Sequence, residues 1–152
     1  MRFQDKAAGF EISYPASWRR LPGGDEVRLV AGRGSASLLV RVAPIGFRIG
    51  PENVKDARKL TDELVRASGH AKLLRKPKRT LLGGLPGYAY LYTFRDSDAG
   101  ALGAHAHYFL FRDDTMITLV FQALPADRLT GLAPLFDRVA DTFTARGPSR
   151  RR

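Results

Sequence analysis

Apolar and polar residues alternate along much of this chain, which is the pattern of strands that bury one face. The stretch Phe10–Tyr14 is the first clear case, with apolar residues at every second position. Pro15 should end this strand, because proline has no N–H to donate to a neighbouring strand. The large apolar ring of Trp18 follows shortly afterwards, so this stretch predicts where a packed domain begins.

Turn residues separate the other strands that the alternation predicts. Short turns are expected at Gly32-Arg33-Gly34, Gly83–Gly87 and Asp113-Asp114, with a longer polar loop around residues 96–100. Strands joined by such short connections run antiparallel. The strands that we expect in this way are Val27–Ala31, Ser35–Ala43, Ala71–Leu82 (extended or bent), Tyr88–Arg95, His105–Arg112 and Thr115–Leu124.

Two segments follow the 3.6-residue period of amphipathic helices instead. The first opens at Pro51 and should stop at Gly69, and the second covers about Ala126–Thr144, where Pro134 should cause a kink or a fresh helix start. We expect their apolar stripes to face the sheet, with Val54, Ala57, Leu60, Thr61, Leu64 and Val65 in the first and Leu129, Leu132, Leu135, Phe136, Val139 and Phe143 in the second. The order of elements predicts an α+β domain with helices packed on an antiparallel sheet.

Composition narrows the class of protein. The chain has 152 residues, of which 44% are hydrophobic and 10% aromatic, as in a globular domain. It has no apolar run long enough to cross a bilayer. It also has no cysteine, and this absence excludes disulfides, thiolate metal sites, a thiol nucleophile and a lipid-anchored cysteine. We expect a cytoplasmic protein from the sequence as it stands, or a secreted or cell-envelope protein if a leader has been removed.

Positive charge is concentrated in two places. The net charge is +10, and ten of the 25 bases lie in Arg66–Arg79 and in the tail Arg146–Arg152, neither of which contains an acid. Such segments attract phosphate, an anionic membrane or an acidic partner, but they can equally be a solvated sheet edge and a disordered tail. Lysine and proline in Lys76-Pro77-Lys78-Arg79 would also keep a free strand edge from pairing with other chains.

Residues that could carry out chemistry are few. His105 and His107 lie on one face of a strand, a spacing that some metal sites use, but two histidines make an incomplete ligand set. The serines lack a nucleophile-elbow context, the glycine-rich turns lack the Lys-Ser/Thr of a phosphate loop, and no carboxylate pair stands out. We therefore expect a protein that is not an enzyme and needs no cofactor or metal, with His105 and His107 as weak metal candidates.

Aromatic residues follow one face of the strand Tyr88–Arg95. Tyr88, Tyr90, Tyr92 and Phe94 alternate with smaller residues, which is typical of a core face under a helix. If the stripe were exposed instead, it would form an aromatic and basic binding face with its charged neighbours. The binding candidates on this hypothesis are Lys72, Arg75, Lys76, Lys78, Arg79, Tyr88, Tyr90 and Tyr92.

Three short motifs resemble the PsbP-like superfamily, which includes a Ran-GTPase-binding import factor and many bacterial proteins. They are the opening Phe10–Pro15 with Trp18, the Gly-x-Pro turn in Leu82–Tyr88, and the closing helix Leu135–Phe143. The resemblance implies an α/β/α sandwich around a mainly antiparallel sheet of about six to seven strands with two main helices. Residues 1–145 would form this domain and residues 146–152 a basic disordered tail. Members of the superfamily mostly bind proteins rather than catalyse reactions.

Three functions fit these observations. The preferred one is a non-enzymatic protein-interaction or accessory module that binds a protein partner, possibly acidic, through the sheet and its basic face. A second is binding of an amphipathic or acidic lipid-like ligand in a cleft between sheet and helix. A third is contact with nucleic acid through the basic segment and the tail.

Overall fold

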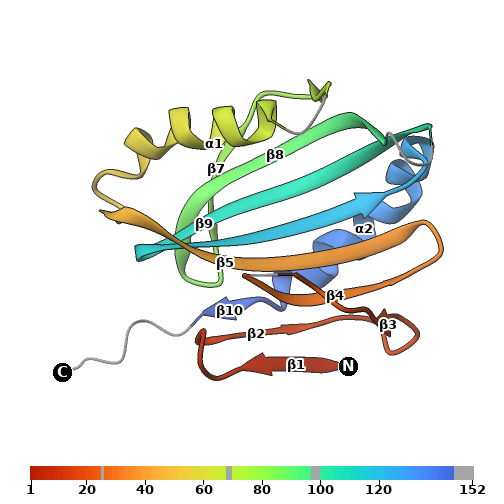
Figure 1. Ribbon diagram of the computed structural model, residues 1–152, viewed down its shortest axis with the longest axis horizontal. Coiled ribbons are helices and arrows are strands. Elements are labelled where there is room, and N and C mark those ends of the chain that lie inside the picture. The colour runs from red at the N-terminus through yellow and green to blue at the C-terminus, as the bar shows by residue number, and fades with distance from the viewer. Residues whose placement is uncertain (25, 68–69, 97–99, 146–152) are drawn as a thin grey trace.

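The computed structural model describes residues 1–24, 26–67, 70–96 and 100–145. It is a layered α+β sandwich in which a large antiparallel sheet lies between helix α1 on one face and helix α2 with a small second sheet on the other (Figure 1). The strands are β1 (Arg2–Asp5), β2 (Phe10–Ser13), β3 (Arg19–Arg20), β4 (Val27–Arg33), β5 (Ala36–Ile49), β6 (Lys72–Leu73), β7 (Lys78–Leu82), β8 (Leu85–Asp96), β9 (Ala101–Ala123) and β10 (Thr144–Ala145). The helices are α1 (Arg58–Arg66) and α2 (Leu129–Asp141), each preceded by a 3-10 turn, η1 (Val54–Ala57) and η2 (Ala126–Arg128).

The seven-stranded main sheet confirms the predicted antiparallel class. Its order is β3-β4-β5-β9-β8-β6, and β7 pairs with β8 as well. β9 turns back on itself near Asp113, whose φ is 55°, so its two halves lie side by side between β8 and β5 (Figure 1). This reversal lies where the Asp113-Asp114 turn was predicted. β6 and β7 therefore form one edge of the sheet.

The opening strand lies outside the main sheet. β2 pairs with β1 and β10 in a separate three-stranded sheet that packs against the α2 side. Its alternation predicts burial correctly, because Phe10 and Ile12 are 2% and 0% exposed. After the strand, the rings of Tyr14 and Trp18 stack with 6.4 Å between their centroids, and both belong to the core of that side.

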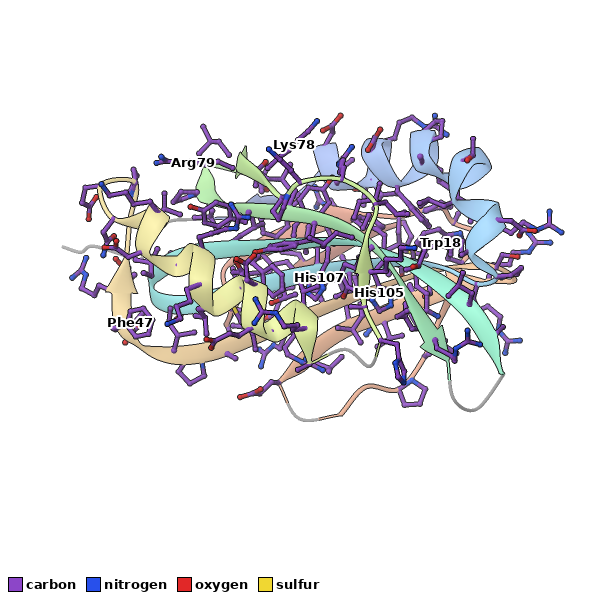
Figure 2. All side chains as sticks on the ribbon, turned by 90° about the horizontal axis from the view of Figure 1, so that it is seen from above. Trp18, Phe47, Lys78, Arg79, His105 and His107 are labelled. Atoms are coloured by element: carbon purple, nitrogen blue, oxygen red, sulfur yellow. The ribbon has the colours of Figure 1, made fainter. Side chains whose placement is uncertain are left out.

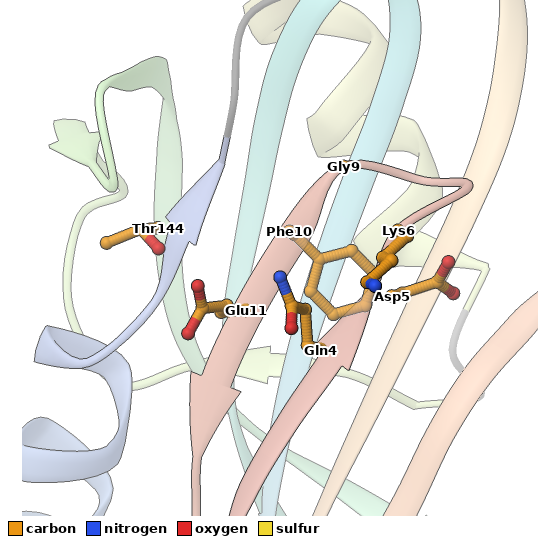
Figure 3. A pocket seen from close by; sticks show the side chains of 7 residues that line it. All are labelled: Gln4, Asp5, Lys6, Gly9, Phe10, Glu11 and Thr144. Carbon is orange, nitrogen blue, oxygen red and sulfur yellow. The ribbon is translucent and has the colours of Figure 1, made fainter.

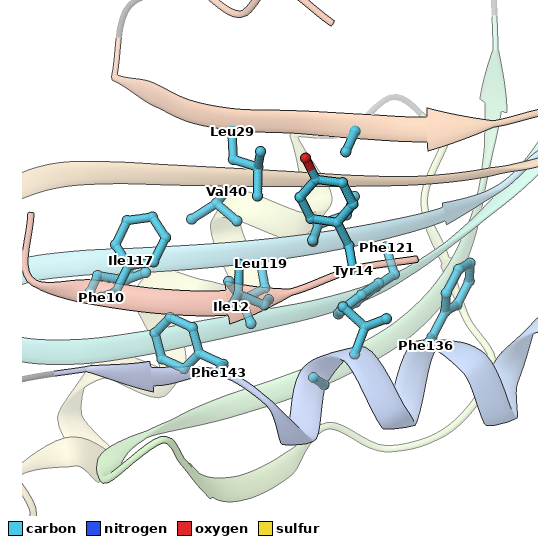
Figure 4. Packing of buried hydrophobic residues seen from close by; sticks show 14 of the residues in the cluster. Phe10, Ile12, Tyr14, Leu29, Val40, Ile117, Leu119, Phe121, Phe136 and Phe143 are labelled. Carbon is cyan, nitrogen blue, oxygen red and sulfur yellow. The ribbon is translucent and has the colours of Figure 1, made fainter. Parts of the chain in front are cut away.

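Each face of the main sheet has its own hydrophobic core. On the α2 side, Phe136 and Phe143 pack with Leu119, Phe121 and the side chains of β2 (Figure 4). On the α1 side, Val54 and Val65 pack over the aromatic rings of β8 and β9. Successive residues of β8 and β9 point to opposite faces, so these strands supply side chains to both cores. We call the two surfaces the α1 face and the α2 face.

Several element boundaries differ from the predicted ones. The first helix is shorter, and Leu64 is 38% exposed because α1 turns it away from the sheet. β8 begins at Leu85, so only Gly83 and Gly84 form the preceding turn, and α2 continues through Pro134. The predicted stop at Gly69 and the basic tail 146–152 lie outside the described residues. Within the described part of the chain, neither helix has the length and apolar character needed to span a membrane.

Candidate functional site

The basic residues singled out in the sequence lie together along the free edge of the main sheet. We call Lys72, Arg75, Lys76, Lys78 and Arg79 the basic edge; all five are exposed. Lys72 belongs to β6, Lys78 and Arg79 belong to β7, and the other two lie in the connection between these strands. Figure 2 shows Lys78 and Arg79 at one margin of the molecule, away from the more central His105 and His107.

The basic edge is held in place by the backbone and keeps its charges available. Lys72 is paired with Thr93 of β8, and the N–H of Leu74 donates to the carbonyl of Leu91 at 2.8 Å. Among the described residues no carboxylate forms an ion pair with any of the five bases. Arg79 donates a hydrogen bond to the carbonyl of Pro51 at 3.1 Å, which leaves its positive charge uncompensated.

The three tyrosines are buried under η1 and α1, as the core interpretation predicted. Tyr88, Tyr90 and Tyr92 are 6%, 2% and 0% exposed, so these rings do not form an exposed aromatic surface beside the basic edge. The hypothesis of an exposed aromatic and basic binding face is therefore wrong for these three tyrosines. The folded chain separates the two groups that the sequence placed together, because the rings point inward while the basic side chains extend outward.

Tyr90 anchors α1 through a polar network that the sequence did not reveal. Its hydroxyl donates to Asp62 at 2.5 Å and shares a 2.6 Å hydrogen bond with Thr61, while Arg58 pairs with the same carboxylate at 3.0 Å. Burial alone would raise the pKa of Asp62, but the hydrogen bonds from Tyr90 and Arg58 outweigh it and hold that pKa below its usual value. Burial, with the Asp62 hydrogen bond, raises the pKa of Tyr90 to about 12. Arg58, Asp62 and Tyr90 also line a cavity of about 270 Å³ beside Leu73. Since the Tyr90 hydroxyl bonds to two side chains of α1, the network ties the helix to the sheet.

His105 and His107 share the hydroxyl of Tyr92 between them. The hydroxyl lies 3.0 Å from Nδ1 of His105 and 2.8 Å from Nδ1 of His107, and Nε2 of His105 lies 2.9 Å from Oε1 of Gln122. Because the Gln122 oxygen can only accept, His105 donates from Nε2, Tyr92 donates to His105, and His107 donates to Tyr92. The fourth ring nitrogen, Nε2 of His107, is left as a buried acceptor with no hydrogen-bond partner among the described residues.

The surroundings of both histidines favour the neutral form. Burial lowers the pKa of His105, although its hydrogen bond to Gln122 acts in the opposite direction. Burial, with smaller effects from the charges of His105 and Arg41, lowers the pKa of His107 to about 3. Three of the four ring nitrogens are already engaged, and no group of three His, Cys, Asp or Glu side chains in the described part of the chain could hold a metal ion. The hydrogen bonds that run from Gln122 through His105 and Tyr92 to His107 lie on the α1 face of the sheet, and we call them the relay.

A cleft of about 260 Å³ lies between α2 and the main sheet. We call it the α2 cleft. Leu91, Ala106 and Phe136 give it apolar walls, and Arg75 of the basic edge lines it together with Asp137. Burial raises the pKa of Tyr108 in this cleft, and the negative charge of Asp137 adds to the rise. Among the predicted binding residues, Arg75 is the one that reaches this cleft.

A further hollow lies on the small sheet, between β1, β2 and β10 (Figure 3). It measures about 230 Å³ and is lined by Gln4, Lys6 and Glu11, among others. Asp5, at its margin, pairs with Arg28 at 2.7 Å, and this hydrogen bond lowers the pKa of the carboxyl. Glu11 pairs with Arg2 as well, so both carboxylates that line the hollow already have arginine partners.

Sequence reasoning missed one conspicuous exposed residue next to the basic edge. Leu81 of β7 is 73% exposed, although it stands in an apolar pair with Leu82, which packs against the α2-side core. The alternation of the strand was the available signal, because it requires one of these two leucines to face away from the core. Which of them is exposed depends on the side of the sheet that α2 and β2 cover.

The sequence matches no protein-family model and no curated protein. Solved structures share its fold. A cyanobacterial PsbP from Synechocystis is similar over 96% of this chain and 92% of its own, with a TM-score of 0.65 and 17% identity. The Ran-binding protein Mog1p of Saccharomyces cerevisiae is similar over 97% and 95%, with a TM-score of 0.63 and 11% identity. A Bacteroides thetaiotaomicron protein matches 99% of this chain with a TM-score of 0.63 and 14% identity, but the chain covers only 50% of that longer protein. These likenesses show that the chain has the PsbP-like fold.

Proposed function

We propose that this chain of PsbP-like fold is a non-enzymatic protein-interaction module whose basic edge binds an acidic protein partner. The observation that carries the proposal is the row of five exposed bases, none of which has a carboxylate partner among the described residues. Unpaired charges of one sign along an exposed edge steer an oppositely charged partner and fix its position.

The chemistry of the interior supports binding rather than catalysis. His105 and His107 bond to Tyr92, His105 also bonds to Gln122, and Asp62 is held by Tyr90 and Arg58, so these groups take part in hydrogen bonds that stabilise the fold. One protein of the same fold is described as Ran-binding, which is an instance of this scaffold in a protein-binding role.

The test is a quantitative pull-down with matched charge variants. The Lys76→Gln, Lys78→Gln, Arg79→Gln triple variant removes three charges from the basic edge. The control, Lys6→Gln, Lys55→Gln, Lys59→Gln, removes three charges from exposed lysines elsewhere. We expect to recover a stoichiometric protein partner at moderate salt, and the control variant should recover it equally well. With the triple variant the amount recovered should fall by about tenfold or more, because close charge pairs at interfaces contribute more than 1 kcal/mol each.

Other outcomes would contradict the proposal. Equal recovery with both variants would place the partner elsewhere, and an empty pull-down with a positive screen for hydrolysis would indicate an enzyme. Nucleic acid recovered in place of protein, with binding that is lost steeply as salt rises, would favour contact with nucleic acid.

A second function is supported by the α2 cleft. Its apolar walls and the cation of Arg75 suit an amphipathic ligand with an acidic head, such as a lipid-like molecule. Native mass spectrometry of the purified chain should then show a co-purifying lipid, which Ala133→Trp would exclude by filling the cleft. If the chain is first stripped of lipid and then mixed with an anionic fatty acid, failure to bind the fatty acid would contradict this second function.

A further inference from the structure

β7 is an edge strand with one side unused. It pairs with β8 from Lys78↔Ala89 to Leu82↔Leu85, and among the described strands β8 is its only partner. The backbone groups on its outer side therefore have no strand to bind. Edge strands of this kind can accept an extended segment of another protein as an additional strand.

The register shows which backbone groups face outward. The tight turn at Gly83 and Gly84 makes Leu82 and Leu85 a hydrogen-bonded pair, so Thr80 and Lys78 also bond to β8. Leu81 lies opposite Pro86, which has no N–H and so fits the pair that exchanges no hydrogen bonds. The bond from Leu74 N–H to the Leu91 carbonyl gives the same alternation further along the edge. The N–H and C=O groups of Arg79 and Leu81 consequently point away from the sheet.

The side chains around these outward groups define what could bind. Arg79 and Leu81 stand on the α1 face of the strand, and Lys78 stands on the opposite face. Leu81 is 73% exposed and both bases are exposed. A strand laid along this edge would place its side chains beside a cation on each face and beside one apolar side chain.

We infer that β7 accepts an extended acidic segment of a partner protein as an additional strand, with the backbone of Arg79 and Leu81 forming the new hydrogen bonds. This inference rests on the proposed function and specifies its binding mode. Two copies of this chain pairing through β7 would bring like charges together, so Lys78 and Arg79 oppose self-association. The same charges attract a strand that carries carboxylates and one apolar residue, which is why we commit to an acidic occupant.

Hydrogen exchange of the full chain tests the geometry directly. In the free protein we expect the amides of Arg79 and Leu81 to exchange fast and those of Lys78, Thr80 and Leu82 to be protected by β8. The probe is a short fluorescent peptide of glutamate, threonine and valine. On adding it, the amides of Arg79 and Leu81 should become protected. Exchange that stays fast at these two amides with the peptide bound would overturn the inference.

The peptide can be altered so that charge and backbone bonding are tested separately. A version with N-methylated central residues keeps the carboxylates but cannot donate its backbone hydrogen bonds. We expect it to bind about tenfold more weakly than the parent, because the loss of one or two hydrogen bonds is worth this factor. A scrambled peptide with prolines in the centre should also bind more weakly, because proline has no backbone N–H to donate.

A variant of the chain gives a second test of the outward N–H. Leu81→Pro removes this donor and leaves the N–H groups that bond to β8 in place, whereas Leu81→Thr keeps the donor and removes the apolar side chain. We expect Leu81→Pro to lose about tenfold or more in peptide affinity and Leu81→Thr to lose less. If Leu81→Pro does not fold, the N-methylated peptide still decides the question with the unmodified chain.

The outcomes separate this inference from the proposed function. The parent and N-methylated peptides could bind equally well, and both could lose binding to the Lys76→Gln, Lys78→Gln, Arg79→Gln variant. That result would support an acidic partner on the basic edge but would overturn strand addition. Binding of neither peptide at low salt, together with a pull-down unaffected by the charge variants, would overturn both.

Discussion

Nε2 of His107 is a buried ring nitrogen with no hydrogen-bond partner among the described residues, and its state follows from three other side chains. Gln122 fixes the proton on His105, His105 accepts from Tyr92, and Tyr92 accepts from His107. A proton added to His107 would create a buried cation near Arg41, which explains why its pKa is lowered to about 3. The relay thus stabilises the α1 side only while both rings are neutral.

The first prediction concerns acid stability. Because the pKa of His107 is about 3 in the folded chain and near 6.5 in the unfolded chain, protons bind the unfolded state preferentially between these values. The free energy of unfolding should fall as the pH drops from about 6.5, by up to about 1.4 kcal/mol per pH unit from this residue. His107→Phe should flatten that fall, as measured by denaturant unfolding at a series of pH values.

The control is His70→Asn, which removes an exposed histidine at a positive φ that asparagine tolerates. This control removes a histidine that takes no part in the hydrogen bonds among His105, His107, Tyr92 and Gln122. Parallel curves for the wild type and His107→Phe would contradict this account of the relay.

The hairpin of β7 and β8 depends on two glycines with different surroundings. Gly83 and Gly84 have φ values of 60° and 88°, so both adopt a backbone that other residues adopt at a cost. A Cβ at Gly83 would lie 2.5 Å from the Phe143 ring, whereas one at Gly84 would meet open space. The turn that places the basic edge is therefore packed against the end of the α2-side core.

The second prediction follows from this difference. Both Gly83→Ala and Gly84→Ala should cost about 1–2 kcal/mol of stability for the positive φ. Gly83→Ala should cost roughly 1–3 kcal/mol more, because Phe143 must move to admit the methyl group. Denaturant melts of the two variants measure the difference, and equal losses would show that Phe143 does not restrict the turn.

The two cores share β8 and β9, so the molecule should unfold as one cooperative unit despite having two hydrophobic layers. Phe109 belongs to the α1-side core and its neighbour Leu110 to the α2-side core. Neither layer can lose its packing without disturbing the sheet that supports the other. The chain also contains a single tryptophan, Trp18, which lies in the α2-side core and reports on that side alone.

The third prediction uses this reporter. Phe109→Leu should lower the free energy of unfolding by about 1 kcal/mol, and the shift seen by Trp18 fluorescence should equal the shift seen by circular dichroism. Lys59→Gln on the exposed side of α1 should leave both midpoints unchanged. A midpoint that moves by circular dichroism but not by Trp18 fluorescence would mean that the two layers unfold separately.

The sequence by itself determined most of the strands, both helices and the antiparallel α+β class. The reason is physical: a buried face imposes a period of 2 on a strand and 3.6 on a helix, and this pattern is local. Burial of Phe10, Ile12 and the tyrosine stripe followed from it, while the turn residues Asp113 and Asp114 predicted the reversal between them. The cluster of bases was equally visible, because charge needs no partner to be counted.

The tertiary structure alone decided which elements meet. β2 pairs with β1 and β10 rather than with the main sheet, and His105 meets Gln122, because these contacts join residues far apart in the chain. It also decided that the tyrosines lie beneath α1 while the basic edge stays free. Leu81 of β7 became exposed beside that edge because α2 and β2 cover the opposite face, where Leu82 packs. Local patterns specify that a face is buried; only the assembled layers specify what buries it.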